Sequence, residues 1–278
     1  MQQKPSRVGA VNDSISDVPA VSWLLCTHVA DEQLRLALQS CLDQTFTDYE
    51  LVIVVNGRSA EDVAIAVQTW VGSDPRVRIF TTEVRHLIFS LSLGLHYARA
   101  ELVARMDSDD LSKRERLGRQ VAFMREHPKV VVLGSAYEII DAGGRPLQKV
   151  WPPTSDIEIR RALLRGNPLC HPSVMFRRKA GLDAGGYLGG LHAEDYDLWV
   201  RLSNDPVNQF ANLPEICLGY RSVGVGTARR SRPAYASMAA TQFRNFINGQ
   251  GLTWAFSAFL STLKAFIRSS PDRQISEK

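Results

Sequence analysis

Short apolar runs that alternate with helical patterns constrain the fold of this chain more than any other feature of its sequence. Each run has the length of a strand, and the runs lie at Val21–Cys26, Leu51–Val55, Val77–Phe80 and Leu102–Met106. Continuously apolar strands separated by helices are typical of a mostly parallel sheet that is covered on both faces. The sequence therefore predicts the α/β fold class.

Helix signals fill the spaces between these runs. Asp31 can cap a helix in which Leu34 and Leu38 repeat every four positions, and Ser59 with Asp62 resembles a capping box. The remaining predicted elements are helices at Leu87–Ala100, at Arg114–His127 and after Ser155, short strands at Val130–Leu133 and Tyr137–Ile140, and a rigid connection at Asn167–Pro172. The regular alternation of strand and helix thus ends after the fourth apolar run.

Length and composition exclude a mainly disordered or fibrous chain. With 278 residues, 45% of them hydrophobic and 22% charged, the chain can bury a sizeable core. This length lies near the upper limit for one domain. We expect a flexible leader at residues 1–19, one folded domain at 20–225 and a basic helical extension at 226–278.

The C-terminal extension combines basic and apolar character. From Arg221 to the end there are nine Lys or Arg residues against Asp272 and Glu277. Residues 254–268 predict an aromatic-rich helix that is too short to span a bilayer, so it either lies on a membrane surface or docks on the core. No basic repeat with interleaved aromatic residues occurs, and nucleic acid is not an expected partner.

The cysteines and the N-terminus indicate an intracellular protein. Cys26, Cys41, Cys170 and Cys217 are widely separated and form no C-x-x-C pair, so they predict reduced, structural thiols. The first 19 residues lack the apolar segment of a secretory signal. The expected location is the cytoplasm, with peripheral contact at the inner face of the cell membrane as the hypothesis for residues 254–268.

An acid cluster follows the fourth apolar run. Asp107, Asp109 and Asp110 repel one another unless a cation compensates them, so a divalent-metal site is the first hypothesis. A calcium loop of the EF-hand type is excluded, because Leu111 and Ser112 stand where it needs an oxygen ligand and a glycine. An aspartyl-phosphate hydrolase is a weaker alternative, since Leu111 replaces its usual Thr or Val. A purely structural role, with Asp110 capping a helix, also stays open.

A second acid cluster opens a predicted helix. Glu194, Asp195 and Asp197 precede or accompany the apolar stripe that contains Leu198 and Leu202. Carboxylates at a helix N-terminus are stabilised by the helix dipole, which is one explanation for the cluster. A carboxylate pointed into a cleft is also what a general base for a hydroxyl group requires.

Several polar residues come directly after predicted strands. They are His28, Asn56 and the acids Asp107–Asp110. Ligands of open α/β sheets bind at the carboxyl ends of the strands. These residues are therefore expected to meet at one edge of the sheet.

A set of motifs spread over about residues 21–221 adds specificity. The two main motifs are Asp107-Ser108-Asp109-Asp110 after a strand and, much later, Glu194-Asp195-Tyr196-Asp197-Leu198-Trp199. The supporting motifs are Gln44-Thr45-Phe46, Ala104-Arg105-Met106-Asp107, Arg116 with Gln120, Asn167-Pro168, His171-Pro172-Ser173-Val174-Met175, Asn212-Leu213-Pro214-Glu215 and Tyr220-Arg221. Together they resemble the family 2 glycosyltransferases of the nucleotide-diphosphosugar transferase (GT-A) fold.

The resemblance implies an inverting glycosyltransferase of the bacterial surface-polysaccharide or lipopolysaccharide type. It implies a Rossmann-like, mostly parallel sheet with a C-terminal helical extension. In such enzymes the D-x-D acids, here Asp107 and Asp109, hold Mg²⁺ or Mn²⁺ against the donor diphosphate. Asp109 is the leading metal ligand, and Asp107 either assists it or contacts the donor ribose. The base maps onto Asp195. The partners implied are a nucleotide-diphosphate sugar and a glycan or lipid-linked acceptor.

Other site residues follow from the same resemblance. Glu194 and Trp199 are expected on the acceptor side, and His171 either faces the acceptor as well or caps a strand by hydrogen bonding. The first-strand motif, usually Pro-Thr followed by an aromatic residue and Asn, is here Cys26-Thr27-His28-Val29. Thr27 fits the pattern, whereas His28 is either a donor-site residue or an ordinary loop histidine.

The chain departs from the family pattern where the donor base is read. Val55 and Asn56 stand where the family often has two acids, so the nucleobase stays unassigned. Asn56 can still hydrogen bond a base, and Arg85 is expected to reach the diphosphate.

Two alternatives of other classes remain at this stage. A nucleotidyltransferase shares the architecture, but its glycine-rich phosphate loop is missing after the first strand. A nucleotide-sugar-binding protein without activity is motivated by Val55 and by the altered first-strand motif.

Overall fold

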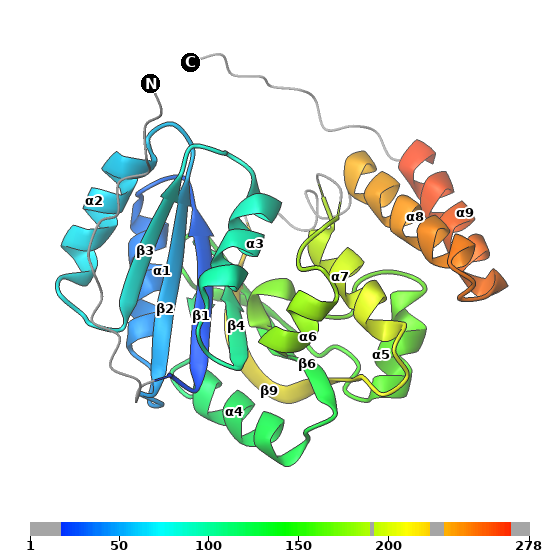
Figure 1. Ribbon diagram of the computed structural model, residues 1–278, viewed down its shortest axis with the longest axis horizontal. Helices are drawn as coiled ribbons and strands as arrows, with labels where there is room; N and C mark the ends of the chain where they lie inside the picture. Colours follow the sequence, from blue (N-terminus) through cyan, green and yellow to red (C-terminus); the bar gives the residue numbers. More distant parts are fainter. Residues whose placement is uncertain (1–17, 190–191, 223–230, 268–278) are drawn as a thin grey trace.

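The computed structural model describes residues 18–189, 192–222 and 231–267, so most of the predicted leader lies outside the described residues. The strands are β1 (Val21–Thr27), β2 (Tyr49–Asn56), β3 (Val77–Thr82), β4 (Leu102–Met106), β5 (Leu111–Ser112), β6 (Val130–Ile140), β7 (Pro146–Val150), β8 (Met175–Arg177) and β9 (Gln209–Arg221). The helices are α1 (Glu32–Leu42), α2 (Ala60–Val71), α3 (Leu87–Tyr97), α4 (Arg116–Glu126), α5 (Asp156–Leu163), η1 (His171–Ser173, a 3₁₀ turn), α6 (Arg178–Asp183), α7 (Glu194–Ser203), α8 (Arg232–Ile247) and α9 (Leu252–Ile267). Figure 1 shows a central sheet between helices, with α8 and α9 at one side.

The strands form one mixed sheet in two halves. Its order is β3-β2-β1-β4-β8-β6-β9-β5, and β7 pairs with β6. The first half, from β3 to β4, is parallel as predicted. Beyond β4 the sheet is mixed, because β8 runs against both β4 and β6, whereas β9 runs parallel to β6. The predicted α/β class with a Rossmann-like first half is thus confirmed, and antiparallel pairs extend it.

Helices cover both faces of the sheet because the buried strands are apolar on both sides. In β1, Val21, Trp23 and Leu25 pack into one core with residues of α1, α2 and α4. Leu24 and Cys26 face the opposite core, which is formed with α3, α5 and α7. This alternation explains why β1 reads as a continuous apolar run in the sequence.

Local sequence signals are only partly confirmed. The Asp31 side chain caps α1 by accepting a hydrogen bond from the Leu34 amide at 2.9 Å. The predicted capping box at Ser59 is wrong, since the Ser59 side chain makes no cap hydrogen bond. The Ser155 hydroxyl also does not cap α5 but donates to Glu158 at 2.6 Å.

Long-range pairing also changes some elements. The two short strands predicted at residues 130–133 and 137–140 are one strand, β6, because β9 pairs along its whole length with small register shifts. The sequence did not predict β5, β7, β9 or α6, whereas α8 and α9 confirm that the C-terminal extension is helical. The cysteines are free and buried, as expected, and burial raises the pKa of Cys26 and Cys41 to about 12.

The Arg116 guanidinium joins the two halves of the sheet. It is fully buried, stacks over the Trp23 ring at 4.7 Å, and donates to the carbonyls of Arg105 in β4 and Pro172 in η1, both at 2.8 Å. Gln120, one turn later, accepts from Arg116 at 3.0 Å and donates to the Ser173 carbonyl at 2.9 Å. Burial lowers the pKa of Arg116 to about 10, which shows how much the surrounding carbonyl groups must compensate.

The C-terminal helices are attached to α7 through a buried carboxylate. Asp197 is 1% exposed and accepts hydrogen bonds from Arg201 in its own helix and from Thr241 and Arg244 in α8. Tyr196 adds a second link, because its hydroxyl accepts from Gln242 of α8 at 2.9 Å. No helix in the described part of the chain is long and apolar enough to cross a membrane.

Replacing Arg116 should test the junction between the two halves. We expect Arg116→Met to lower the free energy of unfolding by about 3–5 kcal/mol, because it leaves several buried carbonyl groups without donors. The measurement is urea unfolding followed by circular dichroism. Arg119→Met on the same helix is the control, and it should cost less than about 1 kcal/mol because its pair with Glu215 is 3.8 Å long and half-exposed. Equal losses in the two variants would contradict this role.

Candidate functional site

The acid cluster forms a compact loop at the carboxyl end of β4. Strand β4 ends at Met106, and one carboxylate oxygen from each of Asp107, Asp109 and Asp110 lies within 4.8 Å of the others. The parallel half of the sheet places the ends of β1 and β2 at the same edge. The structure therefore brings the predicted acids to the edge where the sequence placed them.

The electrostatics of this loop fit a divalent cation. Burial and, next, the neighbouring charge of Asp107 raise the pKa of the Asp109 carboxyl. Ionising Asp109 thus costs more free energy than ionising an isolated carboxyl group, and a positive charge nearby would offset this cost. Carboxylate oxygens are the ligands that Mg²⁺ and Mn²⁺ prefer, so the residues present suit these ions.

Arg105 is a functional candidate that sequence reasoning did not select. Its side chain is 1% exposed and donates to Asp107, while its Nε and Nη1 atoms are buried and have no hydrogen-bond partner among the described residues. Burial opposes its charge, yet the nearby Asp107 raises the pKa of the guanidinium. Arg105 therefore compensates one acid of the loop, and an arginine inside an apolar strand was the signal for it.

Arg221 fixes the backbone of the acid loop from the end of β9. Its amide donates to Asp110 at 2.7 Å, and its Nε donates to the Asp109 carbonyl at 2.6 Å. Asp110 is fully buried. The proposed helix cap at Asp110 is wrong, because α4 begins only at Arg116 and Asp110 instead joins the loop to β9.

The predicted donor-side residues lie at the ends of the neighbouring strands. Thr27 is buried at the end of β1, and its hydroxyl donates to the Val29 carbonyl at 2.8 Å, so it shapes this turn. His28 follows it in an exposed position. Asn56 is 7% exposed at the end of β2, and the exposed Arg85 side chain lies beside Gly57.

The start of α7 carries the predicted base. Asp195 Oδ2 accepts a hydrogen bond from Asn167 Nδ2 at 2.6 Å, and Asn167 Oδ1 accepts from the Leu169 amide at 3.0 Å. The Asn167 amide group is thereby oriented with its donor side towards Asp195. Ala193, directly before the helix, has a left-handed backbone with φ of 59°, which is unusual for a residue with a Cβ. The chain thus enters α7 through a strained position beside the two acids.

A buried histidine lies next to this helix start. His171 Nε2 is 3.0 Å from the Tyr187 hydroxyl, and Nδ1 is 3.8 Å from Glu194 Oε1. Burial raises the pKa of Tyr187, so its hydroxyl stays protonated and can donate to Nε2. We assign the histidine proton to Nδ1, facing Glu194. Tyr187 was not selected from the sequence, although it lies in the glycine-rich segment before α7.

Trp199 corrects one prediction. It was expected on the acceptor side, but its side chain is fully buried and packs edge-on against His171 at 6.2 Å between ring centroids. A ring with no exposed surface does not contact an acceptor in this structure. Trp199 instead packs against the His171 ring within the core.

The acid loop and the start of α7 are linked through neighbouring side chains. Arg105 donates to Asp107, and its charge acts on Tyr187 and Glu194. Tyr187 is hydrogen-bonded to His171, whose Nδ1 lies 3.8 Å from Glu194 Oε1. A loop of three acids and an oriented carboxylate thus border the same region. Such a pair can bind a phosphate-bearing ligand through a metal and remove a proton from a second ligand.

Comparison with known proteins agrees with this geometry. The family model described as glycosyl transferase family 2 matches residues 22–186. The O-antigen biosynthesis glycosyltransferase WbnJ of Escherichia coli is 31% identical over 256 residues, which are 92% of this chain and 100% of WbnJ. The amylovoran biosynthesis glycosyltransferase AmsE of Erwinia amylovora is 33% identical over 193 residues, 69% of this chain and 71% of AmsE.

A solved structure shows the fold independently. The mannosyltransferase PcManGT of Pyrobaculum calidifontis, in complex with GDP-Man and Mn²⁺, superposes with a TM-score of 0.61 over 92% of this chain and 77% of its own. Its sequence identity is 16%, so this likeness concerns the fold. It confirms the expected GT-A architecture.

Replacing Asp109 tests the metal site by stability alone. A raised carboxyl pKa in the folded state means that the ionised group destabilises the metal-free protein above that pKa. We therefore expect Asp109→Asn to be more stable than the wild type at pH 7 in EDTA. This difference should vanish as the pH falls through the raised pKa towards 3.8.

Mn²⁺ should reverse the order of stability. It should raise the melting temperature of the wild type, measured by differential scanning fluorimetry, and leave that of Asp109→Asn unchanged. Asp48→Asn, in an exposed loop, is the control and should respond to Mn²⁺ like the wild type. An equal response of the wild type and Asp109→Asn would contradict the site.

Proposed function

Because this chain belongs to glycosyl transferase family 2, we propose that it is a metal-dependent, inverting glycosyltransferase. It moves a sugar from a nucleotide-diphosphate donor to a glycan or lipid-linked acceptor. The observation that carries the proposal is the Asp195 carboxylate, held by Asn167 beside the region that the acid loop also borders. The biosynthetic setting is a cell-surface polysaccharide, supported by the names of WbnJ and AmsE.

On the donor side, Asp107 and Asp109 would hold Mg²⁺ or Mn²⁺. The ion, when bound, neutralises negative charge on the leaving diphosphate. Arg105 in β4 offsets the negative charge of Asp107, and Arg221 holds the loop backbone through the Asp109 carbonyl. The nucleoside would lie next to Thr27 and Asn56, which are buried at the ends of β1 and β2. The Arg85 side chain is exposed and would turn towards the phosphates.

On the acceptor side, Asp195 acts as the general base. It takes the proton of the acceptor hydroxyl while that oxygen bonds to the anomeric carbon of the donor sugar, and the bond from this carbon to the phosphate oxygen breaks. A single displacement inverts the configuration at this carbon. His171 and Glu194 would flank the approach to the base, and the hydrogen bond from Tyr187 holds the His171 ring in place before the acceptor binds.

Removing the base separates this proposal from its rivals. We expect Asp195→Asn to bind a nucleotide sugar with unchanged affinity and to lose transfer by about 10²–10⁴-fold, because the proton acceptor is gone. A panel of nucleotide sugars with Mn²⁺, read by thermal shift and by product formation, provides the measurement. Asp183→Asn on the surface of α6 is the control and should retain full activity. Unchanged transfer in Asp195→Asn, or no donor binding by the wild type, would refute the proposal.

A charge placed at Asn167 should change the pH dependence of the reaction. In Asn167→Asp the new carboxylate lies beside Asp195, and a like charge raises the pKa of the base. The acidic limb of the kcat profile should therefore move to higher pH, by about one unit or more. Asn167→Ser is the matched control, which should lower kcat without moving this limb. A profile of Asn167→Asp that coincides with the wild type would rule out Asn167 as the residue that positions the base.

A further inference from the structure

The large apolar side chains of helix α9 face outwards, whereas a helix that only packs on a core buries its large apolar side chains. Apart from the buried Trp254, its aromatic residues are exposed, Phe256 by 64%, Phe259 by 63% and Phe266 by 70%, and Ile267 at its end is exposed by 74%. Phe256, Phe259 and Phe266 follow one another at spacings of three and seven, which places them on one face of the helix. The buried face is made mainly of small residues, such as Ala258, Ser261 and Ala265.

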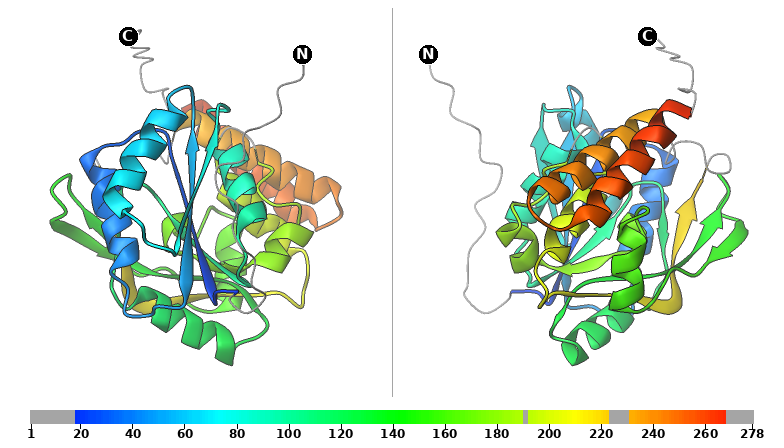
Figure 2. Two further views of the ribbon diagram at one scale, coloured as in Figure 1. Left: turned by 60° about the vertical axis from the view of Figure 1, so that its left-hand side comes forward. Right: turned by 90° about the vertical axis from the view of Figure 1, so that its right-hand side faces the viewer.

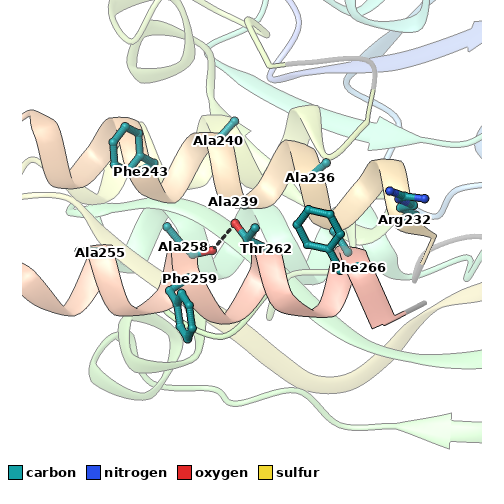
Figure 3. A pocket seen from close by; sticks show the side chains of 11 residues that line it. Arg232, Ala236, Ala239, Ala240, Phe243, Ala255, Ala258, Phe259, Thr262 and Phe266 are labelled. Atoms are coloured by element: carbon teal, nitrogen blue, oxygen red, sulfur yellow. Dashed lines mark hydrogen bonds between the residues drawn. The ribbon is translucent and has the colours of Figure 1, made fainter. Parts of the chain in front are cut away.

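The partner helix explains how the small face is buried. Alanines of α8 and α9 meet along the seam of the hairpin, where Ala239 and Ala258 line the same shallow groove. Figure 3 shows Phe243, Phe259 and Phe266 projecting from the two helices around these alanines. Close packing through small residues leaves the aromatic side chains on the outside, and the right-hand view in Figure 2 shows the hairpin as the outermost layer on its side of the molecule.

The charges of this region have one sign. No Asp or Glu occurs between Glu215 and Asp272, whereas seven Lys or Arg residues do. On the hairpin, Lys264 Nζ lies 5.8 Å from the centre of the Tyr235 ring, and the Arg232 guanidinium lies 5.8 Å from that of Phe266. Cations thus border the exposed aromatic face without carboxylates in the same sequence segment.

We propose that the α8–α9 hairpin is a docking surface for an anionic lipid bilayer. The exposed face of α9 enters the interface between head groups and acyl chains, and Lys264 and Arg232 contact the lipid phosphates. An apolar helix face bordered by Lys and Arg is the pattern of helices that lie in the membrane interface. A second copy of this chain fits less well, because a self-complementary contact would bring these cations together without acids to pair with them.

The α8–α9 hairpin is attached to the helix that carries the proposed base. Residues of α8 bind Asp197 and Tyr196, which adjoin Asp195 in α7. In Figure 1 the end of the hairpin where α8 begins and α9 ends lies on the same side as the carboxyl ends of β1 and β2. A bilayer on the hairpin would thus present a lipid-linked acceptor near the site. This use rests on the proposed function, whereas bilayer binding itself does not.

Vesicle flotation of the full chain tests the surface. The wild type should float with vesicles that contain roughly 30% phosphatidylglycerol in phosphatidylcholine, and less with phosphatidylcholine alone. Phe259→Asp combined with Phe266→Asp should reduce the bound fraction at least about tenfold, because two large apolar groups no longer enter the bilayer. Ile65→Asp, at an exposed apolar position of α2, is the matched control and should bind like the wild type. Circular dichroism checks that each variant is folded.

Two further measurements separate the outcomes. Arg232→Gln with Lys264→Gln should remove the preference for anionic vesicles. The proposal is overturned if the wild type does not float, if the double aspartate variant floats equally well, or if light scattering shows a dimer that this variant dissociates. Donor binding by thermal shift without vesicles should be the same in the wild type and the double aspartate variant. Loss of donor binding in both, with vesicle binding kept, would refute the proposed function and leave the surface standing.

Discussion

The buried Arg116 guanidinium is the interaction on which the arrangement of this protein depends. Among the described residues it forms no ion pair with a carboxylate, and it is held by the carbonyls of β4 and η1, by Gln120 and by the Trp23 ring. Removing a charge from water is costly, so the position is tolerated only when every one of these groups is in place. The parallel half, the helix α4 and the mixed half beyond β4 are thereby fixed relative to one another.

The acid loop at the carboxyl end of β4 likewise contains charges that are costly unless neighbouring groups offset them. The negative charges of Asp107 and Asp109 repel each other, and the protein offsets this repulsion with Arg105 in β4 and with Arg221 at the end of β9. The left-handed Ala193 adds backbone strain next to the proposed base. Both features cost stability in the absence of ligand. They are typical of sites whose charges and backbone are arranged before the substrates bind.

Much of the first half of the fold could be predicted from the sequence. The strands of the parallel half are buried on both faces, so their apolar runs carry the signal without knowledge of their neighbours, and Asp31 caps its helix through a contact three residues away. The second half could not be read in this way. Strand β9 contains Glu215 and Arg221 and is defined by pairing with β6, a partner distant in sequence. Likewise, Ser59 carries a capping pattern whose side chain is not used.

The sequence by itself determined the chemical groups: the acids after β4, the Glu194-Asp195 pair and the acid-free C-terminal segment. It also determined that strand ends would gather at one edge, because parallel connections require this. Only the tertiary structure decided which residues support these groups. Asn167 meets Asp195, Arg221 meets the acid loop, and Trp199 lies inside the core instead of facing a ligand. The physical reason is that a motif fixes residue types over a few positions, whereas burial and hydrogen-bond partners depend on packing between segments far apart in the chain.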